Sequence, residues 1–155
     1  MKKFECQQCG HCCTGLLGVE DGREYGIYLT PEETKFFPSE TVFPLFRSGG
    51  SIFAYQLGVS DCPNLMDGDD GRKVCKIYLN RPLVCRSFPA GISDDGRIII
   101  QYDKCSFTAK HIHQKWAMTS FSPCFQAVVE QIRQANETPQ ATEMFVLNGK
   151  KWVTL

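Results

Sequence analysis

Apolar residues near the end of the sequence recur with the spacing of a helix. The residues that share one predicted helix face are Phe125, Val128, Val129 and Ile132. Ser122 and Pro123 precede them as a cap and a first helical residue, and Thr138-Pro139 follows them as a stop signal. The pattern predicts an amphipathic helix between these two signals.

Two β-prone segments follow this helix, one on each side of Asn148-Gly149. Residues 144–147 and 150–153 contain apolar and aromatic side chains that are typical of strands. Asn-Gly readily adopts the positive φ angles that a two-residue hairpin turn needs. The sequence therefore predicts a terminal β-hairpin.

Shorter strands are predicted earlier in the chain. Residues 23–29 alternate loosely between apolar and polar side chains. Residues 52–57 and 74–79 are apolar or aromatic and flank an acidic, glycine-containing surface loop at 67–71, so we expect these two segments to pair or to pack nearby. Residues 96–102 contain three consecutive isoleucines after an Asp-Gly turn, which predicts a largely buried strand.

A short helix is predicted to begin after Thr30. Thr30 can act as the N-cap, Pro31 fits the first helical position, and Glu33 completes a capping box. Pro38 follows soon, so this helix should be brief. Together these elements indicate an α+β fold class with short strands, much loop, a C-terminal helix and a terminal hairpin.

Composition narrows the class of protein further. A chain of 155 residues suits a single domain, and its 17 Lys and Arg balance its 17 Asp and Glu, so no net field favours nucleic acid or an anionic membrane as a partner. The start of the sequence lacks an apolar stretch behind its lysines, and no later segment reaches membrane-spanning length. We therefore expect a cytoplasmic, soluble protein.

Nine cysteines are more than a cytosolic chain of this size needs for packing. A reducing compartment keeps thiols from pairing, so the count points to metal, with a disulfide framework as the alternative. An odd number would leave one thiol over in a disulfide framework, whereas metal sites built from four ligands tolerate a spare.

The N-terminal cysteines have the spacing of a ligand loop. Cys6, Cys9 and Cys12 are each three residues apart, as in the loops that hold iron–sulfur cubes in bacterial ferredoxins. Gly10 follows the second cysteine, as in zinc knuckles, so spacing alone leaves iron and zinc open. Cys13 directly follows Cys12, and since adjacent side chains usually diverge, the pair indicates two centres or one polynuclear centre.

Later cysteines complete the candidate ligand set. The predicted metal ligands are Cys6, Cys9, Cys12, Cys13, Cys62, Cys75, Cys85 and Cys105. Eight thiols are the number that two tetrahedral sites or two cubes require. Cys124 lies on the apolar face of the predicted C-terminal helix, so we expect it to be a small buried hydrophobe. We interpret residues 1–110 as the metal-binding domain, and residues 111–155 as a helix and hairpin packed on it.

Other residues near the cysteines have supporting roles to consider. Lys76, Arg81 and Arg86 can offset thiolate charge and lower thiol pKa values, with plain solvent exposure as the alternative. His11 is expected to face solvent or to hydrogen-bond a thiolate rather than to bind metal. His111 and His113 are interpreted as a surface pair. Phosphate-loop, nucleophile-elbow and metalloprotease motifs are absent, and whether the chain is an enzyme stays open.

The order of the motifs resembles a known family. Cys6–Cys13 is followed by Leu29–Glu33, then Cys62-Pro63, then the run Cys75–Pro89, which contains Arg81-Pro82 and Phe88-Pro89. This set is similar to the CxxCxxCC cysteine-cluster family, described as a zinc- or iron-chelating domain. The resemblance implies metal binding without an assigned activity.

The resemblance also bears on which metal is bound. A longer relative, the flagellin lysine methylase, carries this cysteine pattern with an iron–sulfur cluster. The resemblance therefore implies an iron–sulfur cluster or iron in preference to zinc. The methyl transfer of that relative is not carried across, because the present chain is much shorter and lacks a glycine-rich loop that would cradle a nucleotide-like cofactor.

Overall fold

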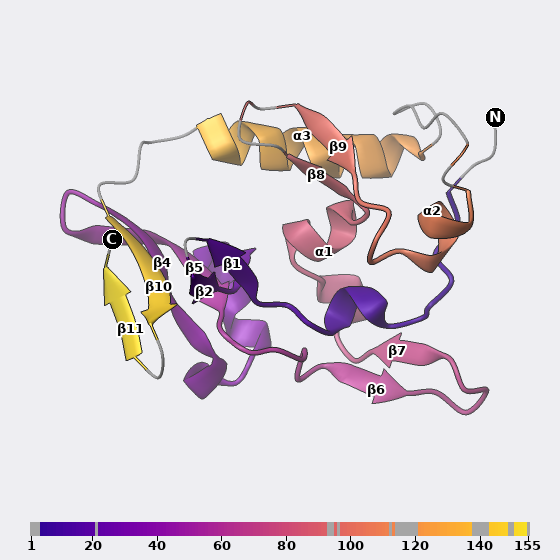
Figure 1. The fold of residues 1–155 in the computed structure, drawn as a ribbon, viewed down its shortest axis with the longest axis horizontal. Coiled ribbons are helices and arrows are strands. Elements are labelled where there is room, and N and C mark those ends of the chain that lie inside the picture. The colour runs from indigo at the N-terminus through magenta and orange to yellow at the C-terminus, as the bar shows by residue number, and fades with distance from the viewer. Residues whose placement is uncertain are drawn as a thin grey trace.

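The computed structural model describes residues 4–20, 22–92, 95, 97–111, 113, 121–137, 143–148 and 151–154. A large sheet forms one end of the molecule, and short helices and two small ribbons form the other, with one long helix along the top (Figure 1). The sheet strands are β1 (Gly18–Glu20), β2 (Arg23–Tyr25), β3 (Ile27–Leu29), β4 (Val42–Ser48), β5 (Ser51–Leu57), β10 (Glu143–Asn148) and β11 (Lys151–Thr154).

The remaining elements are short except for the last helix. The two ribbons are β6 (Leu65–Asp67) with β7 (Lys73–Cys75), and β8 (Ala90–Ile92) with β9 (Ile98–Ile100). The 3-10 helices are η1 (His11–Cys13), η2 (Pro31–Phe36), η3 (Ser39–Thr41) and η4 (Tyr78–Asn80). The α-helices are α1 (Leu83–Ser87), α2 (Ser106–Lys110) and α3 (Pro123–Glu137). The mixture of strands and helices agrees with the predicted α+β class.

The C-terminal hairpin is confirmed, and its first strand lies inside the sheet. β10 and β11 pair antiparallel, with Val146 opposite Val153. The strand order is β1-β2-β10-β4-β5-β3, so β10 stands between strands from the first third of the chain. The turn residues Gly149 and Lys150 lie outside the described part. The proposed boundary near residue 110 stays a prediction.

Gln56 joins four segments of the sheet. Its side chain is fully buried, and its Nε2 donates hydrogen bonds to the carbonyls of Pro44 at 2.7 Å and Phe145 at 2.9 Å. Its Oε1 accepts a 2.6 Å hydrogen bond from the amide of Gly26. A buried amide side chain is stable only when its polar atoms have partners, and here those partners hold β4, β10 and the β2–β3 junction to β5.

Residues 23–29 form two strands where the sequence predicts one. A Cβ atom on Gly26 would lie 2.0 Å from the carbonyl oxygen of Leu57, so the backbone passes too close to β5 for any larger residue. β2 pairs with β1, whereas β3 pairs with β5. Gly26 therefore marks the point where the chain crosses from one neighbour strand to another.

Residues 74–79 pack near residues 52–57, since Ile77 lies against the buried cluster that contains Leu57. They do not pair with residues 52–57, because β4 and β3 occupy both edges of β5, and β7 pairs with β6 instead. The predicted burial of the strand in residues 96–102 is wrong. The β9 strand exists, but Ile98 is 38% exposed and Ile99 45% exposed. A ribbon of two strands, β8 and β9, cannot cover both of its own faces.

Both predicted helices are present. η2 has the capping box formed by Thr30 and Glu33 and ends before Pro38, although its hydrogen bonding is 3-10. α3 spans the predicted range and contacts α1 and β8, with Val129 buried on its inner face. In the described part of the chain, no helix is long and apolar enough to cross a membrane.

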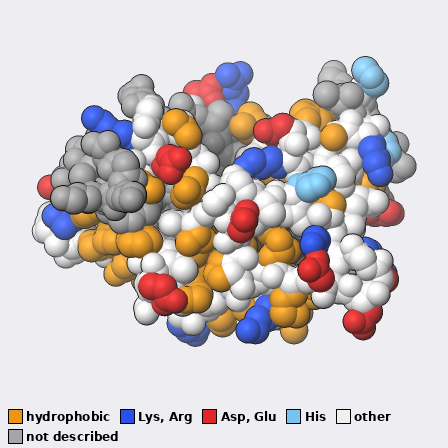
Figure 2. Space-filling model, turned by 60° about the horizontal axis from the view of Figure 1, so that its bottom comes forward, with side chains coloured by type: hydrophobic (Ala, Val, Ile, Leu, Met, Phe, Trp, Pro, Cys, Tyr) orange, Lys and Arg blue, Asp and Glu red, His pale blue; other side chains and the backbone are white. Residues whose placement is uncertain are grey.

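The core beside the cysteines is small and apolar. Leu29, Phe37 and Leu57 are its buried centre, and Cys62 and Ile77 pack against it from the loop region. On the face shown in Figure 2, hydrophobic side chains are interspersed with side chains of both charges. The sheet end and the cysteine end of the molecule therefore meet at this shared apolar cluster.

Candidate metal centre

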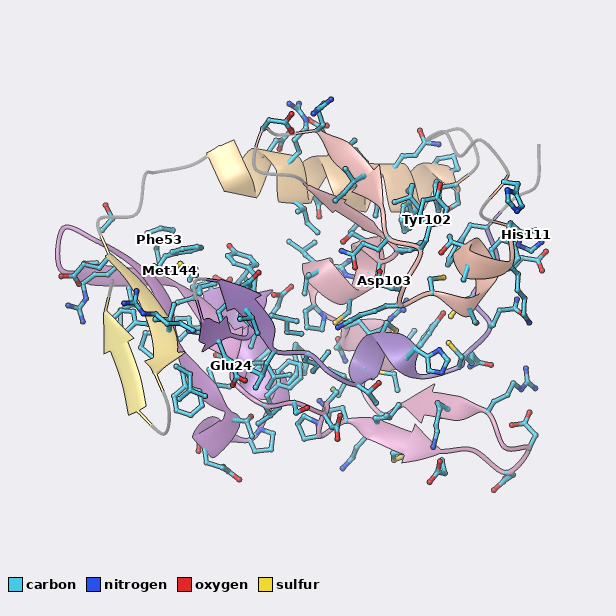
Figure 3. The ribbon with its side chains drawn as sticks, in the orientation of Figure 1. Glu24, Phe53, Tyr102, Asp103, His111 and Met144 are labelled. Atoms are coloured by element: carbon cyan, nitrogen blue, oxygen red, sulfur yellow. The ribbon has the colours of Figure 1, made fainter. Side chains whose placement is uncertain are left out.

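Backbone hydrogen bonds hold the N-terminal cysteine segment against later loops. The Lys73 amide donates to Gln8 O at 2.9 Å, and the Cys62 amide donates to Cys13 O at 2.8 Å. The Leu16 amide donates to Ser60 O at 2.7 Å. These bonds bring a segment from the start of the sequence beside residues 44 to 65 positions later, so that cysteines from both parts share one region. Figure 3 shows sulfur atoms gathered between the N-terminal segment, α1 and α2.

Gly10 is required by the turn that η1 makes. Its φ is +77°, a left-handed conformation that side-chain-bearing residues rarely adopt. A Cβ atom at this position would also lie 2.5 Å from Cγ of Lys73. The glycine after the second cysteine thus permits both the turn and the close approach of β7.

A cavity of about 200 Å³, hereafter the first cavity, has thiols on its wall. Its cysteines are Cys6, Cys12, Cys13, Cys62, Cys75 and Cys85. The apolar part of the wall includes Leu16, Ile27, Phe37, Leu65, Ile77 and Val84. Cysteines from η1, the loop before β6, the end of β7 and the middle of α1 therefore converge on one largely apolar space.

A second cavity of about 260 Å³ adjoins the first. Cys6, Cys12 and Cys85 line both cavities, while Cys9 and Cys105 line only the second. Phe4 reaches into an aromatic cluster at its edge, with its ring centroid 5.4 Å from that of Phe107 and 5.5 Å from that of Phe121. All eight predicted ligand cysteines thus lie on one or both of two neighbouring cavities, and all eight are free thiols.

The vicinal cysteines have opposite pKa shifts. A hydrogen bond from the Cys13 thiol is the largest influence on Cys12 and lowers its pKa to about 7, in spite of burial. The same hydrogen bond is the largest influence on Cys13 and raises its pKa, with burial adding to the effect. In the metal-free protein one proton is therefore held between the two sulfurs, mainly on Cys13.

Burial and neighbouring thiols raise the pKa values of the deeper cysteines. Burial is the main cause for Cys85, whose pKa rises to about 12, and negative charge on Cys62, Cys12 and Cys75 adds to it. Burial likewise raises the pKa of Cys62. These mutual effects mean that the thiols lie within electrostatic reach of one another. Because they cannot all ionise together unaided, a bound cation would be the natural counter-charge.

Arg81 is a basic residue that lines both cavities. Its guanidinium lies 4.0 Å from the centre of the Tyr78 ring, and its Nε donates to Tyr78 O at 3.1 Å. From this position it lowers the pKa values of Cys12 and Cys85. The predicted electrostatic role therefore holds for Arg81. Arg86 is exposed at the rim of the second cavity, and Lys76 is exposed and lines neither cavity.

Neither cavity is lined by His11, His111 or His113. His11 is exposed, and its backbone amide, rather than its ring, is placed to donate to Cys9. Burial raises the pKa of Cys9, but hydrogen bonds from Ser106 and from the His11 amide outweigh it and lower the value overall. His111 Nδ1 donates a 2.7 Å hydrogen bond to the Phe107 carbonyl. The side chain of Cys124 lies outside the described part.

Lys104 is a cavity residue that the sequence analysis did not single out. It lines both cavities, and its Nζ donates to Gly15 O at 2.5 Å. Its position directly before Cys105 is the signal that could have identified it. Phe88 also lines both cavities.

The cysteine thiols suit a thiophilic metal, but in this structure they do not converge on a single position at metal-ligand distance. Among the described side chains, no group of three or more His, Cys, Asp or Glu is already in an arrangement that would hold a metal ion. The thiols instead stand on the walls of a cavity. Sulfur donors of this kind suit zinc and iron–sulfur clusters and disfavour magnesium or calcium.

Comparison with known proteins identifies one family. Residues 5–106 match the family model CxxCxxCC, described as "Putative zinc- or iron-chelating domain". No curated protein and no solved structure matches the chain. The matched range contains both cavities' cysteines and ends before α3.

Proposed function

Because the chain belongs to the CxxCxxCC family of zinc- or iron-chelating domains, we propose that it is a metal-binding protein with a polynuclear, thiolate-bound centre. The group favoured is an iron–sulfur cluster in the first cavity. The biological role beyond holding this centre is unassigned.

The size of the first cavity is the observation that carries this proposal. In a tetrahedral zinc site each Zn–S bond is about 2.3 Å, so four sulfurs stand about 3.8 Å apart and enclose no free space. The first cavity, at about 200 Å³, is far larger than the space inside such a site. A group containing several iron and sulfide atoms suits such a space better than a single ion, and the apolar wall would limit contact with water.

Four cysteines are the preferred ligands of this centre. Cys12, Cys62, Cys75 and Cys85 all line the first cavity, and each of the other three raises the pKa of Cys85. Cys13 lines the same cavity but shares a proton with Cys12. It would be the alternative ligand from η1. Such a cluster, when bound, supplies one-electron redox chemistry, while Arg81 offsets thiolate charge and Phe88 excludes water.

The second cavity offers a smaller set of thiols. Cys6, Cys9 and Cys105 lie there, and Cys105 is buried. These three, with a shared cysteine, are candidates for a second centre.

Metal analysis after anaerobic purification tests the proposal. We expect a brown protein with broad visible absorption that contains iron and acid-labile sulfide. A colourless protein with stoichiometric zinc would overturn the iron–sulfur assignment and leave the family's zinc chelation. A protein that takes up neither metal would overturn metal binding itself.

Serine variants test the ligand set. Cys62→Ser, Cys75→Ser and Cys85→Ser should each lose most of the visible absorption, since each removes a thiolate from the first cavity. Cys124→Ser is the matched control, because Cys124 is outside the family match and is expected to be a hydrophobe. An unchanged spectrum in all three test variants would exclude this ligand set.

A metal-dependent enzyme is the second candidate function. Beside its thiols, the first cavity has apolar lining residues such as Ile27, Phe37 and Val84, which could contact a substrate. A metal held there with an open coordination position would supply the chemistry to activate that substrate. If an added small anion such as cyanide alters the electron paramagnetic resonance spectrum of the loaded protein, that open position exists. An unaltered spectrum would argue against direct metal catalysis.

A further inference from the structure

Glu33 has hydrogen bonds beyond those of a capping box. Its Oε2 accepts a 2.8 Å hydrogen bond from the amide of Thr30, as the sequence predicts. Its Oε1 accepts a second 2.8 Å hydrogen bond, from the amide of Leu83, which is fifty positions away in the sequence. The residue is only 9% exposed. One buried carboxylate therefore connects η2 to the start of α1.

The start of α1 is where Cys85 is fixed. Leu83 is the first residue of this helix, and Cys85 is its third. The first amides of a helix have no partner within the helix, and α1 has only five residues with which to build internal hydrogen bonds. The Cys85 amide donates to Pro82 O at 3.0 Å, so its position follows that of the Pro82–Leu83 peptide. Glu33 holds that peptide from outside the helix.

The far end of η2 is connected to a second candidate ligand. Asn64 is buried, and its Nδ2 donates to Phe36 O at 3.0 Å. Its own backbone carbonyl accepts from the amide of Lys76, next to Cys75, at 2.8 Å. η2 thus stands behind two walls of the first cavity, one carrying Cys85 and the other Cys75. η2 has one contact with each wall. The contact with the Cys85 wall is made by the carboxylate of Glu33, and the contact with the Cys75 wall is made by the backbone carbonyl of Phe36.

We propose that Glu33 is a positioning residue for Cys85: by accepting from Leu83 it sets the direction in which the Cys85 sulfur enters the first cavity. The inference rests on the proposed metal binding and adds to it a residue that is not itself a ligand. Glu33 of the Thr30–Glu33 capping box would then both cap η2 and orient a metal ligand.

Glu33→Gln removes the interaction with little change of shape. A carboxylate offers an acceptor oxygen to each amide, whereas a glutamine has one acceptor oxygen and one NH₂ group. In the variant, either Thr30 or Leu83 would face an NH₂ group and lose its hydrogen bond. Glu32→Gln is the matched control, because Glu32 is the neighbouring carboxylate in η2 and is exposed.

Cobalt(II) titration of the metal-free protein under anaerobic conditions measures the effect. Cobalt binds thiolates and reports them through sulfur-to-metal charge-transfer absorption. Wild type and Glu32→Gln should give the same band and the same affinity. Glu33→Gln should give a weaker band and at least a tenfold lower affinity, since loss of partners that orient a ligand typically costs about 10- to 100-fold. Equal affinity and band in Glu33→Gln would overturn the proposal.

Leu83→Pro is a second variant that removes the same hydrogen bond from the other side. Proline has no amide hydrogen but fits the first position of a helix, and Pro82 already has the extended φ of −54° and ψ of 155° that a following proline requires. It should reproduce the cobalt result of Glu33→Gln, and the double variant should be no worse than either single one. Additive losses would overturn the proposal.

Testing Glu33→Gln in protein that lacks the Cys85 thiol separates an effect on the position of Cys85 from an effect on the stability of the fold. In Cys85→Ser protein, Glu33→Gln should leave the cobalt band unchanged, because the sulfur that it positions is gone. A further loss in that background would mean that Glu33 acts on the fold rather than on Cys85. If wild type takes up neither cobalt nor iron, the proposed function itself fails. If wild type takes up cobalt and Cys85→Ser has the same cobalt band and affinity as wild type, only the positioning role of Glu33 fails.

Discussion

The sheet end and the cysteine end of this protein are built in different ways. β4 and β5 have seven residues each and lie next to strands on both sides, with Gln56 bonded across them. The cysteines lie on or beside elements of three to five residues, such as η1, β7, α1 and α2. Helices and ribbons this short are marginal on their own. We therefore expect the sheet to be stable without metal and the cysteine end to depend on the proposed metal.

Metal removal should give the largest difference between the two ends. We expect a chelator to abolish hydrogen-exchange protection in η1, α1 and the β6–β7 ribbon, while amides of β4 and β5 keep theirs. Exchange measured by mass spectrometry on loaded and metal-free protein provides the check. Equal loss of protection at both ends would mean that the metal organises the whole fold.

Gln56→Leu should weaken the sheet end specifically. The change removes three hydrogen bonds and leaves the Gly26 amide and two carbonyls without their buried partner. We expect a loss of about 3 kcal/mol in the free energy of unfolding. Urea denaturation of the loaded protein measures it, with the exposed Gln131→Leu on α3 as control. A loss no greater than that of the control would contradict the role given to Gln56.

Gly10→Ala should act at the cysteine end by a smaller amount. Gly71→Ala is a close control, since Gly71 has a φ of +76° and open space where a Cβ would lie, whereas Gly10 has a φ of +77° and Lys73 in the way. The control should cost about 1 kcal/mol from backbone strain, and Gly10→Ala should cost more and also lower metal affinity. Thermal melts and cobalt titration of both variants decide the matter, and equal costs would show that the Lys73 contact is unimportant.

Replacing Arg81 by Met should have the smallest effect. Arg81 lowers the pKa of Cys12, which lies at about 7 and below the ordinary thiol value of 9.0. Without this guanidinium the pKa should rise, so less Cys12 thiolate would be present at neutral pH. In wild-type metal-free protein, alkylation of Cys12 should increase as the pH rises through about 7, because the thiolate is the reactive form.

The readout for Arg81→Met is the midpoint of that alkylation profile, followed by mass spectrometry of the Cys12 peptide. The midpoint should move to higher pH in Arg81→Met and stay in place in Arg86→Met, whose guanidinium is exposed. A midpoint unchanged in both variants would remove Arg81 from the electrostatics of the site.

Local patterns were enough to predict some elements but not their neighbours. The capping box of η2, the span of α3 and the C-terminal hairpin each depend on residues a few positions apart, such as Thr30 with Glu33. The pairing of β7 with β6, and the exposure of Ile98 and Ile99, depend on which strands had free edges. Sequence spacing does not contain that information.

In the candidate site, too, local sequence features could be predicted and long-range contacts could not. The thiols could be chosen from the sequence by their number and order, and they lie on two adjoining cavities. Which of them share a cavity could not be predicted, because Cys12 approaches Cys62 and Cys85 only through long-range backbone contacts. The contact of Glu33 with Leu83 has no local signature either, since fifty residues separate the two groups.

The place of β10 in the sheet also has a consequence for synthesis of the protein. A ribosome adds about 5 to 20 residues per second, so the strand at 143–148 is made several seconds after β2 and β4, between which it lies. All eight candidate thiols precede it in the chain. Nascent chains therefore expose all eight candidate thiols before the sheet can be completed, so the proposed metal binding can begin before the sheet has folded.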